Sequence, residues 1–174
     1  MNTELSRPRL GRFGRFFRRS AAYLVDIVLL FGLLAPLGGL VQQALGVTPQ
    51  MGEDLYLVIL LNFSLPAWAY FILSETLWGG STLGKRLFRL RVVADHGGKI
   101  TFGQSLLRTA IKLLPWELVH LSGFTNPAGE FTFLQGAGLL LANVLTILYL
   151  ASALVTLGQR ALHDFAARTS VTAF

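Results

Sequence analysis

The chain contains no cysteine, and charged residues make up only 14% of its 174 residues. The lack of cysteine excludes a disulfide framework, a thiolate nucleophile and any metal site built on thiolates. Soluble domains of this size usually carry about a quarter charged residues. The low charge, together with 53% hydrophobic residues and a mean hydropathy of +0.57, instead predicts an integral membrane protein.

Acidic residues are scarcer than basic ones, which gives a net charge of +6. The fifteen Lys and Arg residues fall in three blocks, with six in 7–19, seven in 85–112 and two at 160 and 168. Apolar segments separate these blocks, so they form no single basic face or recognition helix. We therefore expect no nucleic-acid partner.

Long segments with few charges predict the membrane spans. Residues 20–52 contain one charge, residues 55–84 contain one, and residues 131–159 contain none. The first segment is too long for a signal peptide and carries a carboxylate, so we expect it to be retained. Since about 20 apolar residues cross a bilayer, we expect spanning helices at about 20–41, 55–77 and 133–157.

The segment 106–124, "LLRTAIKLLPWELVHLSGF", is compatible with an interfacial amphipathic helix or with a span. If all three basic blocks lie in the cytoplasm, the chain crosses the membrane an even number of times between Lys112 and Arg160. The segment then supplies the fourth span. The predicted fold is an all-α transmembrane bundle of four spans with both termini cytoplasmic.

Three segments lie outside the spans in this prediction. Residues 1–19 form a basic cytoplasmic segment, and residues 158–174 form a cytoplasmic helix that ends the chain. Between the second and third spans, the loop 79–105 contains β-branched residues around the turn sequence "DHGG". This pattern predicts a short cytoplasmic hairpin that pairs Leu90–Ala94 with Lys99–Phe102.

Asp26 stands within the first predicted span, seven residues and about 10 Å beyond Arg19. A charge at the centre of a membrane helix costs about 2.5–3.5 kcal/mol, so Asp26 should face the bundle and find a partner. The C-terminal sequence "RALHDFAART" offers His163 and Asp164, and Asp164 lies four residues from both Arg160 and Arg168. We predict a polar cluster of Arg19, Asp26, His163 and Asp164, joined by Lys85 or Arg86.

Two further carboxylates interrupt the apolar segments. Glu75 lies near the end of the second span, where we expect a hydrated helix end. Glu117 follows Pro115 and precedes His120 by one turn, and a helix broken at the proline is a candidate ion site because broken helices often line such sites. The last span carries small and polar residues at spacings of three and four, which predict a close helix–helix contact. These residues are Gly138, Ala142, Thr146, Tyr149, Ala153 and Thr156.

Other chemistries find little support. The three histidines are far apart in the sequence and lack zinc-site spacing. The sequence "GGSTLGK" at 79–85 lacks the phosphate-loop register, because Arg86 stands where Ser or Thr is required. No nucleophile-elbow sequence is present. We therefore expect neither an enzyme nor a bound metal or cofactor.

Three stretches resemble the RDD family of bacterial membrane proteins: "RRSAAYLVD" (18–26), "STLGKRLFRLRVV" (81–93) and "RALHDFAART" (160–169). The resemblance runs in order over about 15–112 and 158–171. It identifies the family's defining residues as Arg19, Asp26 and Asp164. It also matches a cytoplasmic loop motif at Gly84, Lys85 and Arg86. The resemblance implies a multi-pass protein of the bacterial cytoplasmic membrane, for which solute transport, including sodium/proton exchange, has been suggested.

Two functions are compatible with these features. In the first, the protein supports solute or cation transport, with Asp26, Glu117 and His163 as candidate ion or proton sites. In the second, it is an accessory or assembly factor whose charged cluster is a structural clamp. Anionic lipid headgroups would then bind the basic loop, at about 1 kcal/mol per Lys or Arg. In both cases we expect the bilayer as a partner and either a homo-oligomer or a complex with another membrane protein.

Overall fold

The computed structural model describes residues 13–50, 52–125 and 132–174. Along the chain, the elements are α1 (Gly14–Leu45), α2 (Glu53–Ile59), η1 (Leu60–Ser64), α3 (Leu65–Leu77), α4 (Leu83–Leu87), β1 (Leu90–Ala94), α5 (Phe102–Phe124), α6 (Phe133–Val155), α7 (Leu162–Ala166) and β2 (Thr169–Ala173). The predicted N-terminal segment 1–19 lies mostly outside the described residues.

Among the described residues, three helical segments are long and apolar enough to cross a membrane. They are α1, the continuous run Asp54–Leu77 formed by α2, η1 and α3, and α6. Large apolar side chains cover the outside of the bundle, as Phe133 and Val155 illustrate with 92% and 82% exposure. Such a surface suits lipid and would be unfavourable in water.

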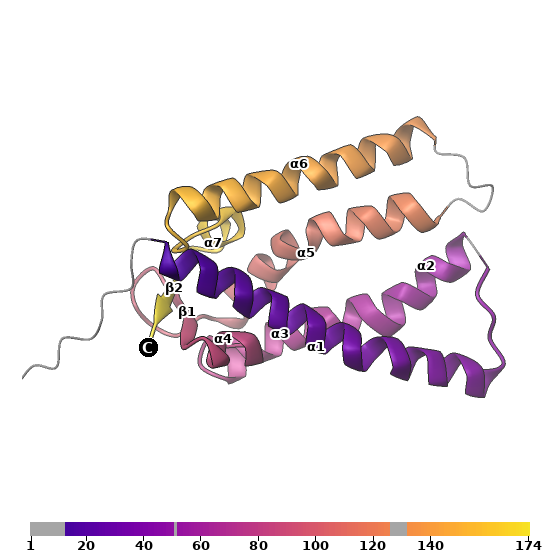
Figure 1. Cartoon of the computed structure of the whole chain (residues 1–174), viewed down its shortest axis with the longest axis horizontal. Helices are drawn as coiled ribbons and strands as arrows, with labels where there is room; N and C mark the ends of the chain where they lie inside the picture. The colour runs from indigo at the N-terminus through magenta and orange to yellow at the C-terminus, as the bar shows by residue number, and fades with distance from the viewer. Residues whose placement is uncertain (1–12, 51, 126–131) are drawn as a thin grey trace, which may run out of the picture.

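Helix α5 runs beside α6 for most of its length (Figure 1). The Tyr149 hydroxyl of α6 donates to the carbonyl of Ile111 in α5 over 2.6 Å, and Ser122 lies against Gly138. The predicted small-residue contact on the last span is therefore confirmed, and its partner is α5. The assignment of α5 as a fourth span stays a prediction.

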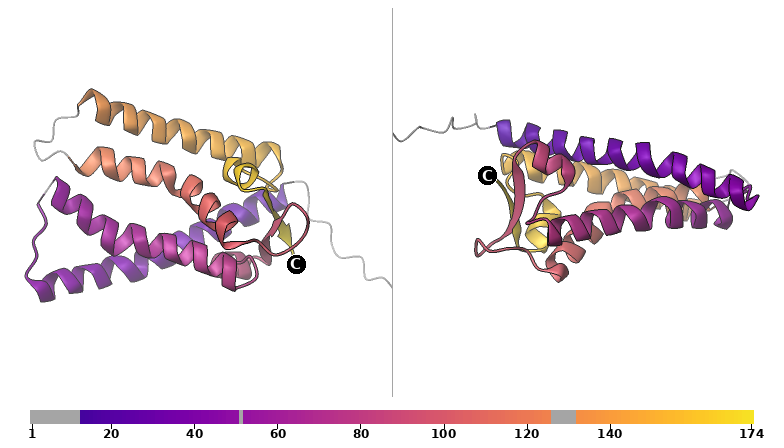
Figure 2. Two further views of the ribbon diagram at one scale, coloured as in Figure 1. Left: turned by 180° about the vertical axis from the view of Figure 1, so that it is seen from behind. Right: turned by 90° about the horizontal axis from the view of Figure 1, so that it is seen from below.

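One end of the bundle, here called the polar end, carries α4, α7, β1 and β2 together with the first turns of α1 and α5 (Figures 1 and 2). Strand β1 pairs antiparallel with β2, with Leu90 opposite Ala173 and Ala94 opposite Thr169. The predicted hairpin of 90–94 with 99–102 is wrong, because β1 takes its partner from the C-terminal segment. The predicted helix over 158–174 is also wrong: only α7 is helical, and the alternation that buries Thr169 and Val171 forms a strand.

The prolines of the apolar helices do not end them. Pro115 lies inside α5 and Pro36 inside α1, so the predicted break at Pro115 is wrong. Pro66 instead follows the π-helical turn η1, where the missing proline N–H is accommodated by a widened turn. Membrane helices tolerate such sites when neighbouring groups satisfy the freed carbonyls.

Candidate functional site: a buried ionic core and an adjacent cavity

Arg108 of α5 lies at the centre of a buried ion-pair network, with its side chain 1% exposed. Its Nε donates to Oδ1 of Asp164 over 2.7 Å, and its Nη1 donates to Oε1 of Glu75 over 2.5 Å. Arg19 donates to Oδ2 of Asp164 over 2.5 Å, and Lys85 donates to Oε1 of Glu75 over 2.5 Å. The network therefore connects α1, α3, α4, α5 and α7, and we call these five residues the ionic core.

Each carboxylate of the ionic core is fully buried and accepts from two cations. Burying an ion costs several kcal/mol, and only well-placed partners offset that cost. Asp164 also accepts the backbone N–H of Ala161 over 2.7 Å. Burial alone would raise the pKa of Asp164, but the attraction of Arg108 and Arg19 holds this pKa well below its usual range. Asp164 is therefore a permanent anion at physiological pH.

His163 of α7 contacts the ionic core as a neutral ring. Its Nε2 lies 2.9 Å from Nη2 of Arg19. Because a guanidinium can only donate, this nitrogen must accept, which requires an unprotonated Nε2. Burial lowers the pKa of His163 well below its usual value, with the charges of Arg108 and Arg19 opposing protonation further and Asp164 favouring it. The predicted neighbourhood of Arg19, His163 and Asp164 is thus present.

Asp26 is held by a different set of groups. Its Oδ1 accepts from the Tyr70 hydroxyl over 2.6 Å and from the backbone N–H of Gly84 over 2.8 Å. Its Oδ2 accepts from the Thr82 hydroxyl over 2.5 Å. Tyr70 in turn accepts the N–H of Leu83 over 3.0 Å, so Asp26 fixes the start of α4 against α1. The prediction that Asp26 joins the Arg19 cluster is wrong, since its three donors are neutral groups.

Gly84 is required where α4 meets α1. A Cβ atom at this position would overlap the carbonyl oxygen of Ala22 and lie 2.9 Å from Oδ1 of Asp26. Only glycine permits this approach, because it has no side chain. The loop motif Gly84, Lys85 and Arg86 therefore divides into separate roles: the glycine allows contact, and the lysine enters the ionic core. Arg86 lies on the surface, where it donates to the Trp78 carbonyl over 3.3 Å and stacks on the Trp78 ring.

Several predicted partners change in the folded chain. Arg160 pairs with Asp95 on the surface over 2.6 Å, so its predicted pairing with Asp164 within one helix is wrong. Glu75 was expected at a hydrated helix end but is completely buried. Arg108 was not predicted as a site residue. The sequence feature that could have indicated it is a polar stripe at helical spacing on α5, formed by Ser105, Arg108, Thr109 and Lys112.

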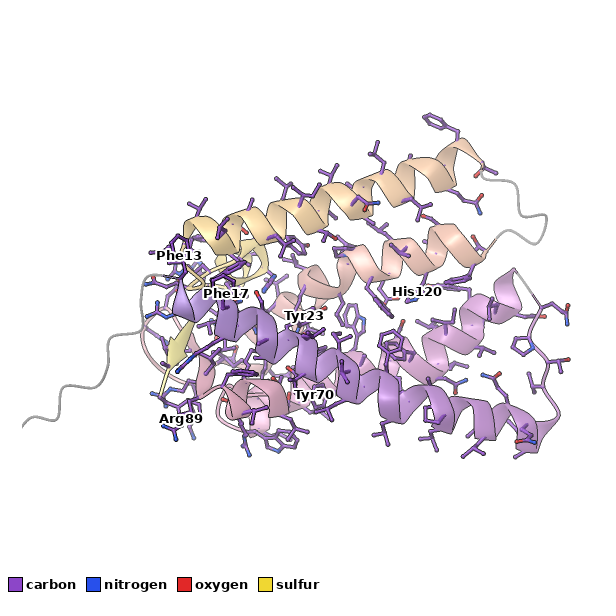
Figure 3. The ribbon with its side chains drawn as sticks, in the orientation of Figure 1. Phe13, Phe17, Tyr23, Tyr70, Arg89 and His120 are labelled. Atoms are coloured by element: carbon purple, nitrogen blue, oxygen red, sulfur yellow. The ribbon has the colours of Figure 1, made fainter. Side chains whose placement is uncertain are left out.

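Glu117 belongs to a second polar site, away from the ionic core. Its Oε1 accepts from Nε1 of Trp68 over 3.0 Å, and its Oε2 accepts from the Ser64 hydroxyl in η1 over 3.1 Å. His120 lies one turn further, on the side of α5 turned toward α2 (Figure 3). The three candidate ion sites, Asp26, Glu117 and His163, therefore lie in three separate environments. Across residues 13–50, 52–125 and 132–174, the structure places no group of three or more His, Asp or Glu residues suited to a metal ion.

A cavity of about 350 Å³ lies beside the ionic core, lined by residues of α1, α5 and α6, with Lys85 of α4 and His163 of α7 at the polar end. Tyr23 reaches it from the side of α1 turned toward α5 (Figure 3). Basic groups line its polar end, and apolar side chains line the rest. The basic lining residues are Arg19, Lys85, Arg108 and Lys112, and the main apolar ones are Phe16, Trp116, Val119 and Leu150.

Lys112 differs from the other cations that line the cavity. Its Nζ is buried and has no hydrogen-bond partner in the described part of the chain. It lies 3.3 Å from the centre of the Phe71 ring, a cation–π contact that replaces only part of its hydration. A buried ammonium without a hydrogen-bond partner, on a residue whose side chain lines a cavity, favours an anion nearby.

An apolar helical bundle with a buried ionic core beside a polar end is typical of a helical membrane protein. The RDD family model matches residues 13–168, and the chain belongs to the RDD family. No curated protein and no solved structure matches the chain. The residues that the resemblance identified, Arg19, Asp26 and Asp164, hold α4 and α7 to the bundle.

Proposed function

We propose that this protein binds an organic anion inside the membrane, as the binding step in transport of that anion. The observation that carries the proposal is Lys112: its side chain lines the cavity, and its buried Nζ has no hydrogen-bond partner in the described part of the chain. A buried cation without an anion is unfavourable. A carboxylate or phosphate in the cavity would relieve this cost.

The charges around the cavity support an anion over a cation. Lys112 adds to the three cations of the ionic core, whereas Glu75, Asp164 and Asp26 are the nearby carboxylates. With His163 neutral and Lys112 protonated, four positive charges stand against three negative ones, so the site has a net charge of +1. A monovalent anion would make the site neutral.

The hydrogen bonds of Asp26 favour a structural role for this residue. Three donors hold its two oxygens. Cation/proton exchange at this carboxylate would require these donors to be released in each cycle, with α4 moving away from α1. We therefore propose that Asp26 clamps α4 to α1 and that the cavity, rather than the family's carboxylates, binds the transported molecule.

The distribution of basic residues supports a cytoplasmic polar end. The cavity would then open in the cytoplasmic half of the bilayer. A second role, contact with anionic headgroups, is favoured by exposed arginines beside the half-exposed Trp78 ring, which suits the membrane interface. These arginines are Arg86, Arg89 and Arg91.

The proposal is tested with protein purified in a neutral detergent, using the shift in thermal unfolding midpoint as the measure of binding. We expect sodium butyrate to raise the midpoint of wild type and of Lys99→Gln, an exposed-lysine control, but not that of Lys112→Gln. In proteoliposomes with a pH-sensitive dye, we expect no sodium-driven proton movement above that of empty liposomes. Sodium-driven proton flux that Asp26→Asn abolishes in a folded protein would contradict the proposal and establish exchange instead.

A further inference from the structure

The residues that line the cavity indicate which class of anion it binds. This inference rests on the proposed function. We infer that the ligand is an amphiphile with one acidic headgroup and an acyl chain, which enters sideways from the bilayer between α1 and α6. The headgroup would lie at Lys112, and the chain would lie along the apolar wall toward the middle of the membrane.

The inferred entrance follows from the helices that line the cavity. Helix α6 packs along α5, whereas α1 packs on α4 and η1. The ribbons of α1 and α6 approach each other at the polar end and diverge toward the other end (Figures 1 and 2). Residues of both helices line the same cavity. Entry between these two helices would let a molecule that already lies in the bilayer reach the cavity without crossing the polar end.

The lining changes from charged to apolar along α5. Arg108 and Lys112 lie nearest the polar end, and Pro115, Trp116 and Val119 follow toward the middle of the bundle. The seven residues from Lys112 to Val119 span about 10 Å at the helical rise. A small hydrated anion would leave this wall without a partner, whereas an acyl chain would cover it. An apolar wall with charged groups at one end fits a molecule that has the same two parts.

The opposite wall is formed by Ala161 and by Thr146, Tyr149, Leu150 and Ala153 of α6. The small side chains of Ala153 and Ala161 leave room for a headgroup. The hydroxyl of Tyr149 is already bonded to the carbonyl of Ile111, and Leu150 offers an apolar side chain to the same cavity as Trp116.

The test measures quenching of tryptophan fluorescence by brominated ligands, because Trp116 lines the cavity. The protein is kept in dodecyl maltoside micelles and titrated with 9,10-dibromostearate, its methyl ester, dibromo-phosphatidylglycerol or dibromo-phosphatidylcholine. We expect saturable quenching by an acidic probe, little saturable quenching by the neutral ester or the zwitterionic lipid, and loss of the saturable part in Trp116→Phe. Quenching by dibromostearate alone would identify a free fatty acid as the ligand, and quenching by dibromo-phosphatidylglycerol alone would identify an anionic phospholipid.

Variants connect binding to the proposed site. We expect Lys112→Gln to raise the apparent Kd for the acidic probe by at least about tenfold, as for loss of one partner of a buried charge pair, and Lys99→Gln to leave it unchanged. Ala153→Phe, which fills the space beside the charged groups, should also weaken binding without removing any charge. This variant keeps the test valid if Lys112→Gln fails to fold.

The outcomes separate this inference from the proposed function. Butyrate binding that depends on Lys112 and is as tight as the binding of the long-chain acid would overturn the amphiphile and leave the organic anion standing. Equal saturable quenching by the acid and its methyl ester would also overturn the inference, because the charge would then have no role. If neither butyrate nor any acidic probe binds in a Lys112-dependent manner, both proposals are wrong.

Discussion

Replacing Asp26 by Asn keeps the shape of the side chain and removes its charge. In the folded protein the carboxylate is 1% exposed and accepts hydrogen bonds from Tyr70, Thr82 and the backbone of Gly84. An amide can accept from Tyr70 and Gly84 through its oxygen. Its NH₂ group would face the Thr82 hydroxyl, which would have to turn and accept instead of donating.

The size of the effect follows from these three bonds. A hydrogen bond to a charged group contributes about 1.5–3 kcal/mol, compared with about 0.5–1.5 kcal/mol for a neutral pair. Asp26→Asn therefore weakens each bond by about 1 kcal/mol, and relief of the buried charge offsets part of this loss. We expect the free energy of unfolding to fall by about 1–3 kcal/mol. Asp26→Leu leaves three donors without an acceptor, at about 1–3 kcal/mol each or about 3–9 kcal/mol together, and relief of the buried charge offsets part of this, so we expect a fall of about 3–6 kcal/mol.

The assay is equilibrium unfolding in mixed micelles, followed by tryptophan fluorescence. Asp95→Asn is the matched control, because Asp95 forms a surface pair with Arg160 and its side chain is 39% exposed. We expect this control to change stability by less than about 1 kcal/mol. A stability of Asp26→Leu within 1 kcal/mol of wild type would refute the clamp, since no buried donors could then have lost an acceptor.

Further predictions concern the ionic core, pH and topology. Arg108→Met should lower the free energy of unfolding by about 3–5 kcal/mol, because buried carboxylates then lose one of their cationic partners. Adding Glu75→Leu should restore part of this stability in the same assay. Because burial lowers the pKa of His163, the folded ring stays neutral while the unfolded ring gains a proton below about pH 6.5. Stability should therefore fall as pH drops from 7.5 to 5.5, with a slope of up to about 1.4 kcal/mol per pH unit, and His163→Asn should flatten this slope. Since the chain has no cysteine, Lys99→Cys and Thr132→Cys provide single labelling sites at the two ends of α5. An impermeant maleimide should label only Thr132→Cys in intact cells, and labelling of both from one side would show that α5 does not cross.

The apolar helices could be predicted because their signal is local. A run of about 20 residues without compensating charge has few stable environments other than a bilayer. The pairing of Arg19 with Asp164 could also be predicted, because both stand beside apolar segments that return to the same end of the bundle. In each case, the property that determines the structure is visible within a few residues.

The partners of Asp26 could not be found by searching for opposite charge. The donors are two hydroxyl groups and one backbone N–H, and they meet only because α4 folds back onto α1. Glu75 illustrates the same limit. It lies near the end of a helix, where hydration is the ordinary expectation, but α4 and α5 cover it with Lys85 and Arg108. Long-range packing determined both environments.

The prediction of the strand pairing was wrong for a related reason. A turn sequence between two β-branched stretches favours a local hairpin, which is why Leu90–Ala94 is predicted to pair with Lys99–Phe102. The actual partner, Thr169–Ala173, lies far along the chain and directly follows α7, whose Asp164 belongs to the ionic core. A pairing between such distant segments has no local signal in the sequence.

The balance of charges separates the structural frame from the proposed ligand site. Arg19, Lys85 and Arg108 carry three positive charges, and Asp26, Glu75 and Asp164 carry three negative ones, so the frame is neutral without Lys112. Removing any member of the frame leaves a buried charge or donor without its partner and should destabilise the fold. Removing the charge of Lys112 takes away an unpaired buried cation, so Lys112→Gln should leave the free energy of unfolding unchanged or raise it. A residue whose removal stabilises the protein and abolishes ligand binding is retained for function. A large loss of stability in Lys112→Gln would instead show that this lysine belongs to the structural frame, and the basis for an anion site would be lost.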